Sequence, residues 1–113
     1  MSSPTIQQRV DQTLEVLQEL HYWEFECARL SELALKAKWN LEYVRDELSG
    51  SGENPGKNTD EREAWLRRQT HYQRSEVDLA ETKLRVAQME LRLRHEALKT
   101  HRAILRVLGP GEL

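Results

Sequence analysis

The chain has 113 residues, a formal net charge of −2, 32% charged residues and few glycines and prolines. This length suits one domain, and such a charge density with apolar residues at helical spacing is typical of coiled coils and long helices. No run of about 18 apolar residues is present to cross a bilayer, and residues 1–9 lack the regions of a secretory signal. We therefore expect a cytoplasmic protein that does not bind membranes.

The first predicted element is a helix over about residues 4–48, with Ser3 as its N-cap and Pro4 at its first position. Within it, apolar or small residues recur at alternating spacings of four and three, which is the a/d pattern of a coiled coil. A sustained seven-residue repeat predicts a left-handed supercoil against a partner helix. The predicted seam residues here are Val16, Leu20, Trp23, Cys27, Leu30, Ala34, Ala37, Leu41, Val44 and Leu48.

A polar segment at residues 49–60 ends this helix, and its composition predicts a flexible linker. Its helix-breaking residues are Gly50, Gly52, Pro55 and Gly56. Asp60 and Glu63 have the spacing of a capping box, which predicts the start of a second helix over about residues 61–108. Gly109 and Pro110 end this helix and begin a C-terminal tail at residues 109–113.

Two helices of similar length joined by a short linker predict a long antiparallel coiled-coil hairpin, with residues 1–113 as one helical-hairpin domain. Symmetric closure about the linker places Trp23 opposite Ala87 and Leu30 opposite Ala80, and a shift of one heptad stays open. Net charges of −4 on the first helix and +4 on the second favour this pairing. The seam residues of the second helix are Val77, Ala80, Leu84, Ala87, Leu91, Leu98 and Leu105.

Each predicted helix carries a second apolar row that one seam does not bury. Three interpretations of these rows are open. They are ordinary surface residues, a docking site for another protein, or the contact between two hairpins in a homodimeric four-helix bundle. We adopt the bundle, because exposed apolar patches of this length usually mark an interface. The candidate interface residues are Leu14, Leu17, Phe25, Leu35, Trp39, Leu79, Val86, Leu93, Ala97 and Ile104.

Motifs for catalysis, cofactors and metals are missing from the sequence. The linker glycines do not form a phosphate-binding loop, and no histidine has a glutamate three residues before it, as di-iron bundles require. Cys27 lies in the seam, where it is expected to pack as a small hydrophobic residue. We therefore expect no enzyme activity, no cofactor and no metal.

The C-terminal half of the second helix is basic and could follow a phosphate backbone. The candidate contacts are Arg85, Arg92, Arg94, Lys99, Arg102 and Arg106. Acidic residues of the first helix would neutralise part of this charge, and no aromatic residue interleaves with it to stack on bases. The sequence therefore favours a non-catalytic protein–protein interaction module (an adaptor, assembly factor or regulator) that binds itself and another protein. The alternative is a small regulator that binds nucleic acid through this basic stretch.

Overall fold

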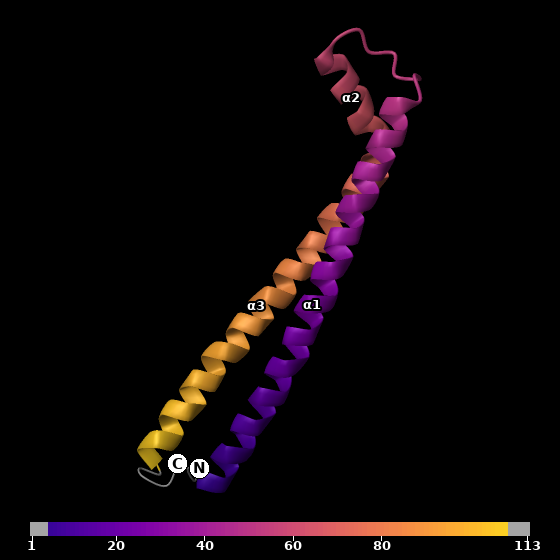
Figure 1. Cartoon of the computed structure of the whole chain (residues 1–113). Coiled ribbons are helices and arrows are strands. Elements are labelled where there is room, and N and C mark those ends of the chain that lie inside the picture. Colours follow the sequence, from indigo (N-terminus) through magenta and orange to yellow (C-terminus); the bar gives the residue numbers. More distant parts are fainter. Residues whose placement is uncertain (1–4, 109–113) are drawn as a thin grey trace. The chain divides into compact units, whose positions relative to one another are not determined.

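The computed structural model describes residues 5–108, and this part of the chain is helical with no strand. Its helices are α1 (Ile6–Gly50), α2 (Thr59–Gln69) and α3 (His71–Leu108), shown in Figure 1. The two long helices, α1 and α3, pack against each other, which confirms the all-α class and a hairpin-like arrangement. Over the same residues, no helix has both the length and the apolar character that crossing a bilayer requires.

The chain folds as two compact units. Unit 1 comprises Met1–Ala28 and Val86–Leu113, so its described part pairs the first half of α1 with the second half of α3. Unit 2 comprises Arg29–Arg85 and contains the rest of α1, the loop, α2 and the first part of α3. The two units therefore share the two long helices, and each has its own buried residues.

The described N-terminus of α1 begins with a capping box at Thr5. The Gln8 backbone N–H donates to Thr5 Oγ1 at 3.2 Å, and the Thr5 N–H donates to Gln8 Oε1 at 2.7 Å. This reciprocal pair satisfies two N–H groups that a helix start leaves without partners. The predicted cap residues, Ser3 and Pro4, lie outside the described residues.

The start of α2 differs from the prediction, and the capping box at Asp60 and Glu63 is wrong. Asn58 is the N-cap, because its side chain accepts a hydrogen bond from the Glu61 N–H at 2.9 Å. Glu61 in turn accepts from the Lys57 N–H at 2.7 Å. Asn is among the best N-cap residues, and here it precedes a glutamate by three positions, so the same signal existed two residues earlier in the sequence.

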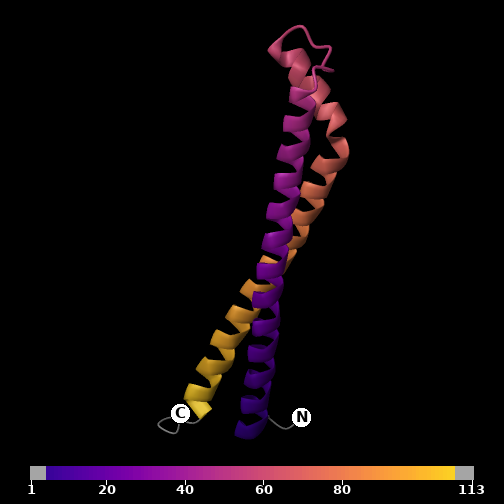
Figure 2. The same ribbon diagram turned by 45° about the vertical axis from the view of Figure 1, so that its right-hand side comes forward.

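The second predicted helix is divided at Thr70 into α2 and α3, and Figures 1 and 2 show the ribbon changing direction there. Thr70 has φ −105° and ψ 19°, away from helical values. Its hydroxyl donates to the Leu66 carbonyl at 2.7 Å, a bond from a Thr side chain to the preceding turn that bends helices. Backbone bonds from Thr70 to Leu66 and from Arg74 to Thr70 nevertheless continue the helical spacing across the bend.

The predicted seam residues form the interior of both units. In unit 1, Leu20, Ala87, Leu98 and Leu105 are buried, with Ala87 only 1% exposed. In unit 2, the buried seam residues are Leu30, Ala34 and Val77, and Leu66 of α2, outside the predicted seam set, is buried as well. The other predicted seam residues are half-buried: Val16, Trp23, Cys27, Ala37, Leu41, Val44, Leu48, Ala80, Leu84 and Leu91. No residue assigned to the seam is exposed.

The register of the two long helices is displaced from symmetric closure. In unit 1, Trp23 faces Arg94, whose guanidinium carbon lies 5.9 Å from the ring centroid, one heptad beyond the predicted neighbour Ala87. In unit 2, Lys38 Nζ lies 3.4 Å from Glu81 Oε1, and Glu81 is likewise further along the chain than symmetric closure requires. At the loop itself Arg45 pairs with Glu63, close to symmetric closure. The displacement therefore arises between Glu63 and Glu81, in the stretch that contains the bend at Thr70.

Candidate interaction surfaces

Unit 1 presents apolar side chains on the outer faces of both its helix segments. On α3, Val86 and Leu93 are 50% and 52% exposed and stand one heptad apart. On α1, Leu14 and Phe25 are also exposed. Of the predicted interface residues in this unit, Leu17, Ala97 and Ile104 are half-buried, so they lie closer to the seam than the others.

Unit 2 carries the remaining predicted interface residues. Leu35 and Trp39 of α1 and Leu79 of α3 are all exposed. A residue on the outer face of a helix makes no contact with the seam, so these side chains are free to meet another surface. The predicted interface residues thus lie in both units, and most of them are exposed.

Several further apolar residues are exposed but do not belong to the predicted interface set. They are Ile6, Tyr22, Leu33, Tyr43, Tyr72, Met89, Val107 and Leu108. For two of them the sequence spacing indicates the exposed face. Tyr22 precedes Phe25 by three residues and Tyr43 follows Trp39 by four, so each tyrosine shares a helix face with a predicted interface residue. Tyr22 also packs edge-on against Trp23, with ring centroids 5.1 Å apart.

The charges of unit 1 are separated between its two helix segments. Residues 6–28 of α1 contain Arg9 and five carboxylates, whereas residues 86–108 of α3 contain five Lys or Arg and two glutamates. In unit 2, by contrast, the segments 29–50 and 71–85 each carry equal numbers of positive and negative residues. Unit 1 therefore has one acidic and one basic helix segment.

The predicted nucleic-acid contacts differ in whether their side chains already have a partner within the protein. Arg94 is half-buried, stacks on Trp23, pairs with Glu90 and lies 3.2 Å from Glu19 Oε2. Lys99 pairs with Glu96 at 3.3 Å, and Arg85 donates to the Thr82 hydroxyl at 3.3 Å. The exposed candidates with neither an ion pair nor a side-chain hydrogen bond among residues 5–108 are Arg92, Arg102 and Arg106. Of the six candidates, Arg94 is therefore the one paired, within the described residues, with a carboxylate of α1, that of Glu19, whereas Arg92, Arg102 and Arg106 are available to bind a ligand.

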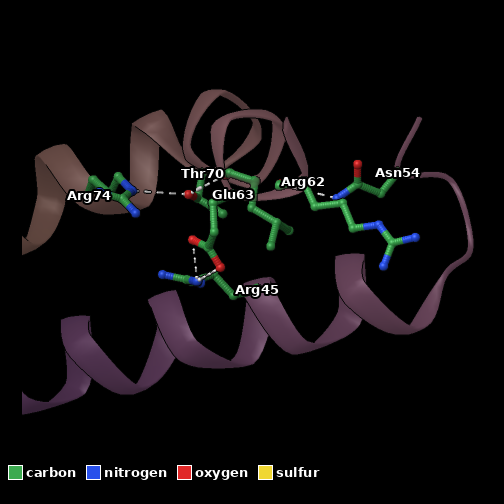
Figure 3. A network of polar contacts seen from close by, with 7 residues as sticks. Arg45, Asn54, Arg62, Glu63, Thr70 and Arg74 are labelled. Carbon is green, nitrogen blue, oxygen red and sulfur yellow. Dashed lines mark hydrogen bonds and ion pairs between the residues drawn. The ribbon is translucent and has the colours of Figure 1, made fainter. Parts of the chain in front are cut away.

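The loop before α2 is tied to that helix by hydrogen bonds (Figure 3). Asn54 donates its side-chain amide to the Arg62 carbonyl at 3.2 Å and accepts from the Gly56 N–H at 2.9 Å. Arg62 Nε donates back to the Gly56 carbonyl at 3.1 Å. The segment that we predicted as a flexible linker thus has local structure of its own, and its flexibility stays a prediction.

The single cysteine, Cys27, is half-buried in unit 1. Burial raises the pKa of its thiol above the ordinary value, and the neighbouring Glu26 carboxylate raises the pKa further. A raised pKa keeps the thiol neutral and makes it a weak nucleophile. Within residues 5–108, no three His, Cys, Asp or Glu side chains gather to hold a metal ion.

No protein-family model matches this chain, and the comparisons with curated proteins and with solved structures found no similar protein.

Proposed function

We propose that this protein is a non-catalytic protein–protein interaction module that associates with a second copy of itself and acts as an adaptor, assembly factor or regulator. The observation that carries the proposal is the pair Val86 and Leu93, which are about half exposed on the outer face of α3. Met89, between them and also exposed, widens the apolar row. Complete burial of a fully exposed side chain of this kind contributes about 1.5–3 kcal/mol, so covering these half-exposed side chains contributes about half of that each.

The charge separation in unit 1 supports a second copy as the partner. In a two-fold dimer, the acidic segment of α1 in one copy and the basic segment of α3 in the other meet twice, because the contact is repeated by symmetry. Opposite charges across an interface raise association rates and disfavour wrong partners. Two such hairpins would form a four-helix bundle, with the apolar rows inside.

The mass in solution tests this proposal. We expect light scattering to give a dimer whose population grows with concentration, and Val86→Glu with Leu93→Glu to give a monomer that keeps its helical circular dichroism. The matched control is Gln88→Glu with His95→Glu, which introduces two glutamates at the same spacing at exposed positions of α3. A wild-type mass of one chain at every concentration, or an unchanged mass in the Val86/Leu93 variant, would contradict self-association.

A second candidate function is nucleic-acid binding by the basic half of α3. Arg92, Arg102 and Arg106 favour it, because they are exposed and have no carboxylate partner among the described residues. Binding to duplex DNA by such contacts should weaken steeply as salt increases from about 50 to 200 mM. Binding that does not change over this range would exclude this function for α3.

A cytoplasmic location is also part of the proposal. It is supported by the single cysteine, which is free and half-buried. Proteins of reducing compartments keep their thiols free.

A further inference from the structure

The bend between α2 and α3 gathers cations and aromatic rings in unit 2. We call residues 64–74 the elbow. It contains Arg67, Arg68, His71 and Arg74 and no acidic residue. The elbow therefore carries a local positive charge, while α2 as a whole has three arginines and three carboxylates.

The surface of the elbow is hollowed where its cations meet. Ala64, Arg67, Arg68 and His71 line one hollow. A neighbouring hollow shares Arg67 and His71, reaches α1 at Leu41 and is also lined by the carboxylate of Asp78. None of the lining residues of the first hollow is acidic, so an anion placed there meets two arginines, a histidine and an alanine.

The cations of the elbow are not neutralised by nearby carboxylates. Arg67 and Arg68 are exposed and form no ion pair within residues 5–108. Two carboxylates are nevertheless close: Glu61 lines a hollow with Arg68, and Asp78 lines one with Arg67. Glu63, the nearest carboxylate before the elbow, is already paired with Arg45 on α1 at 3.1 Å (Figure 3). Arg74 is held in place by a bond from its Nε to the Thr70 hydroxyl at 3.3 Å.

Two aromatic residues flank Arg68 in the sequence. Trp65 is three residues before Arg68, and the two side chains line a further hollow together. Tyr72 is four residues after Arg68 and is 69% exposed. Residues three or four apart are neighbours on a helix surface, which applies to Trp65 and Arg68 within α2, whereas Tyr72 follows the bend in α3. The C-terminal end of α2 favours basic residues through its dipole, which accounts for Arg67 and Arg68 but not for the exposed aromatic ring at the start of α3.

We propose that the elbow binds a short single-stranded stretch of nucleic acid. Arg67 and Arg68 hold phosphate oxygens in the hollow, and an unpaired base stacks on the ring of Tyr72. Single-strand binding sites combine a positively charged surface with aromatic side chains on which bases stack. A duplex keeps its bases paired inside, so Tyr72 contributes nothing to duplex binding. This site is distinct from the apolar rows proposed for self-association and from the basic half of α3.

Fluorescence anisotropy with the full-length chain and a labelled oligonucleotide of about 12 thymidines tests the proposal. We expect saturable binding that weakens with salt and exceeds the binding of a duplex of equal length. Arg67→Ala with Arg68→Ala should weaken binding at least about tenfold and reduce the salt dependence. Tyr72→Ala should weaken it about tenfold, whereas Tyr72→Phe, which keeps the ring, should bind as the wild type does.

Matched variants distinguish binding at the elbow from binding elsewhere on the chain. Lys36→Ala with Lys83→Ala removes the same charge from exposed positions of unit 2 outside the elbow, and it should leave the affinity within about twofold. The Val86→Glu/Leu93→Glu chain should bind the oligonucleotide as the wild type does, so failure of self-association and failure of this site are distinguishable.

Three outcomes would overturn the proposal. The first is no binding at low salt. The second is a loss in Arg92→Ala/Arg102→Ala that equals the loss in Arg67→Ala/Arg68→Ala, which would assign binding to α3. The third is a combined result: polyglutamate competes as effectively as the unlabelled oligonucleotide, and Tyr72→Ala does not change the affinity. That result would mean that the elbow binds anions in general. Circular dichroism of each variant establishes that it is folded.

Discussion

Arg45 of α1 and Glu63 of α2 form an ion pair that joins the two ends of the loop in unit 2. Arg45 Nη2 lies 3.1 Å from both carboxylate oxygens of Glu63 (Figure 3). The two residues are 18 positions apart in the sequence and are 33% and 47% exposed. The pair thus brings the last turns of α1 to the first turns of α2 while it stays in contact with solvent.

This exposure limits the contribution of the pair to stability. We expect Arg45→Ala and Glu63→Ala each to lower the free energy of unfolding by less than about 1 kcal/mol, because solvent screens the charges. A double-mutant cycle in urea measures their coupling, which should be about 0.5 kcal/mol and should decline in high salt. Coupling that is zero at low salt would show that the pair does not close the loop.

Gly56 is required by the close approach of the loop to α2. A Cβ atom at this position would lie 2.6 Å from the Arg62 backbone nitrogen and 2.9 Å from its Cα, so the backbone would have to shift. We expect Gly56→Ala to lower the free energy of unfolding by about 1–3 kcal/mol, measured from the urea midpoint.

Gly50 offers the matched control for this substitution. It is the last residue of α1, and a Cβ there meets no atom within 4 Å. Gly50→Ala should therefore be neutral, or should stabilise the helix by up to about 1 kcal/mol. If both alanine variants unfold at the wild-type midpoint, the loop does not pack closely against α2.

The hydroxyl of Thr70 connects the bend to both flanking helices. It donates to the Leu66 carbonyl and accepts from Arg74 Nε, and the residue is fully buried. Thr70→Val keeps the shape and removes both bonds, so we expect a loss of about 1 kcal/mol in the free energy of unfolding.

Thr82→Val is the control for the Thr70 variant. Thr82 makes the same bond to the carbonyl four residues earlier, at 2.7 Å, but it is exposed. Its replacement should change stability by less than about 0.5 kcal/mol. Equal losses at the two positions would mean that burial at the bend adds nothing to the Thr70 bonds.

Cys27 should react slowly in the folded protein, since its pKa is raised by burial and by Glu26. A thiol of raised pKa stays neutral to higher pH than in the unfolded chain, so its contribution to stability is lost as pH rises through the folded pKa. We expect alkylation by iodoacetamide to have its pH midpoint above that of the chain in urea. Glu26→Gln should lower the midpoint only in part, because burial is the larger cause; a midpoint equal to that of the unfolded chain would show that burial does not raise the pKa.

The sequence by itself determined the helices and their inner faces. The spacing of four and three from Val16 to Leu48 predicts both a helix and the side that it buries, because the period of a helix is a local property of the chain. For the same reason, Leu79, Val86 and Leu93 could be placed on an outer face before any fold was known. The structure leaves all three exposed.

Only the tertiary structure decided the features that depend on which segments meet. The bend at Thr70 coincides with an interruption of the apolar stripe, but whether a helix continues through such a position depends on what its hydroxyl and its neighbours contact. The register that brings Trp23 to Arg94 depends on how the chain between the two long helices folds, and no local sequence pattern predicts that fold. Likewise, Arg67, Arg68 and His71 stand close in sequence, yet the hollow that they line with Ala64 is a property of the folded chain.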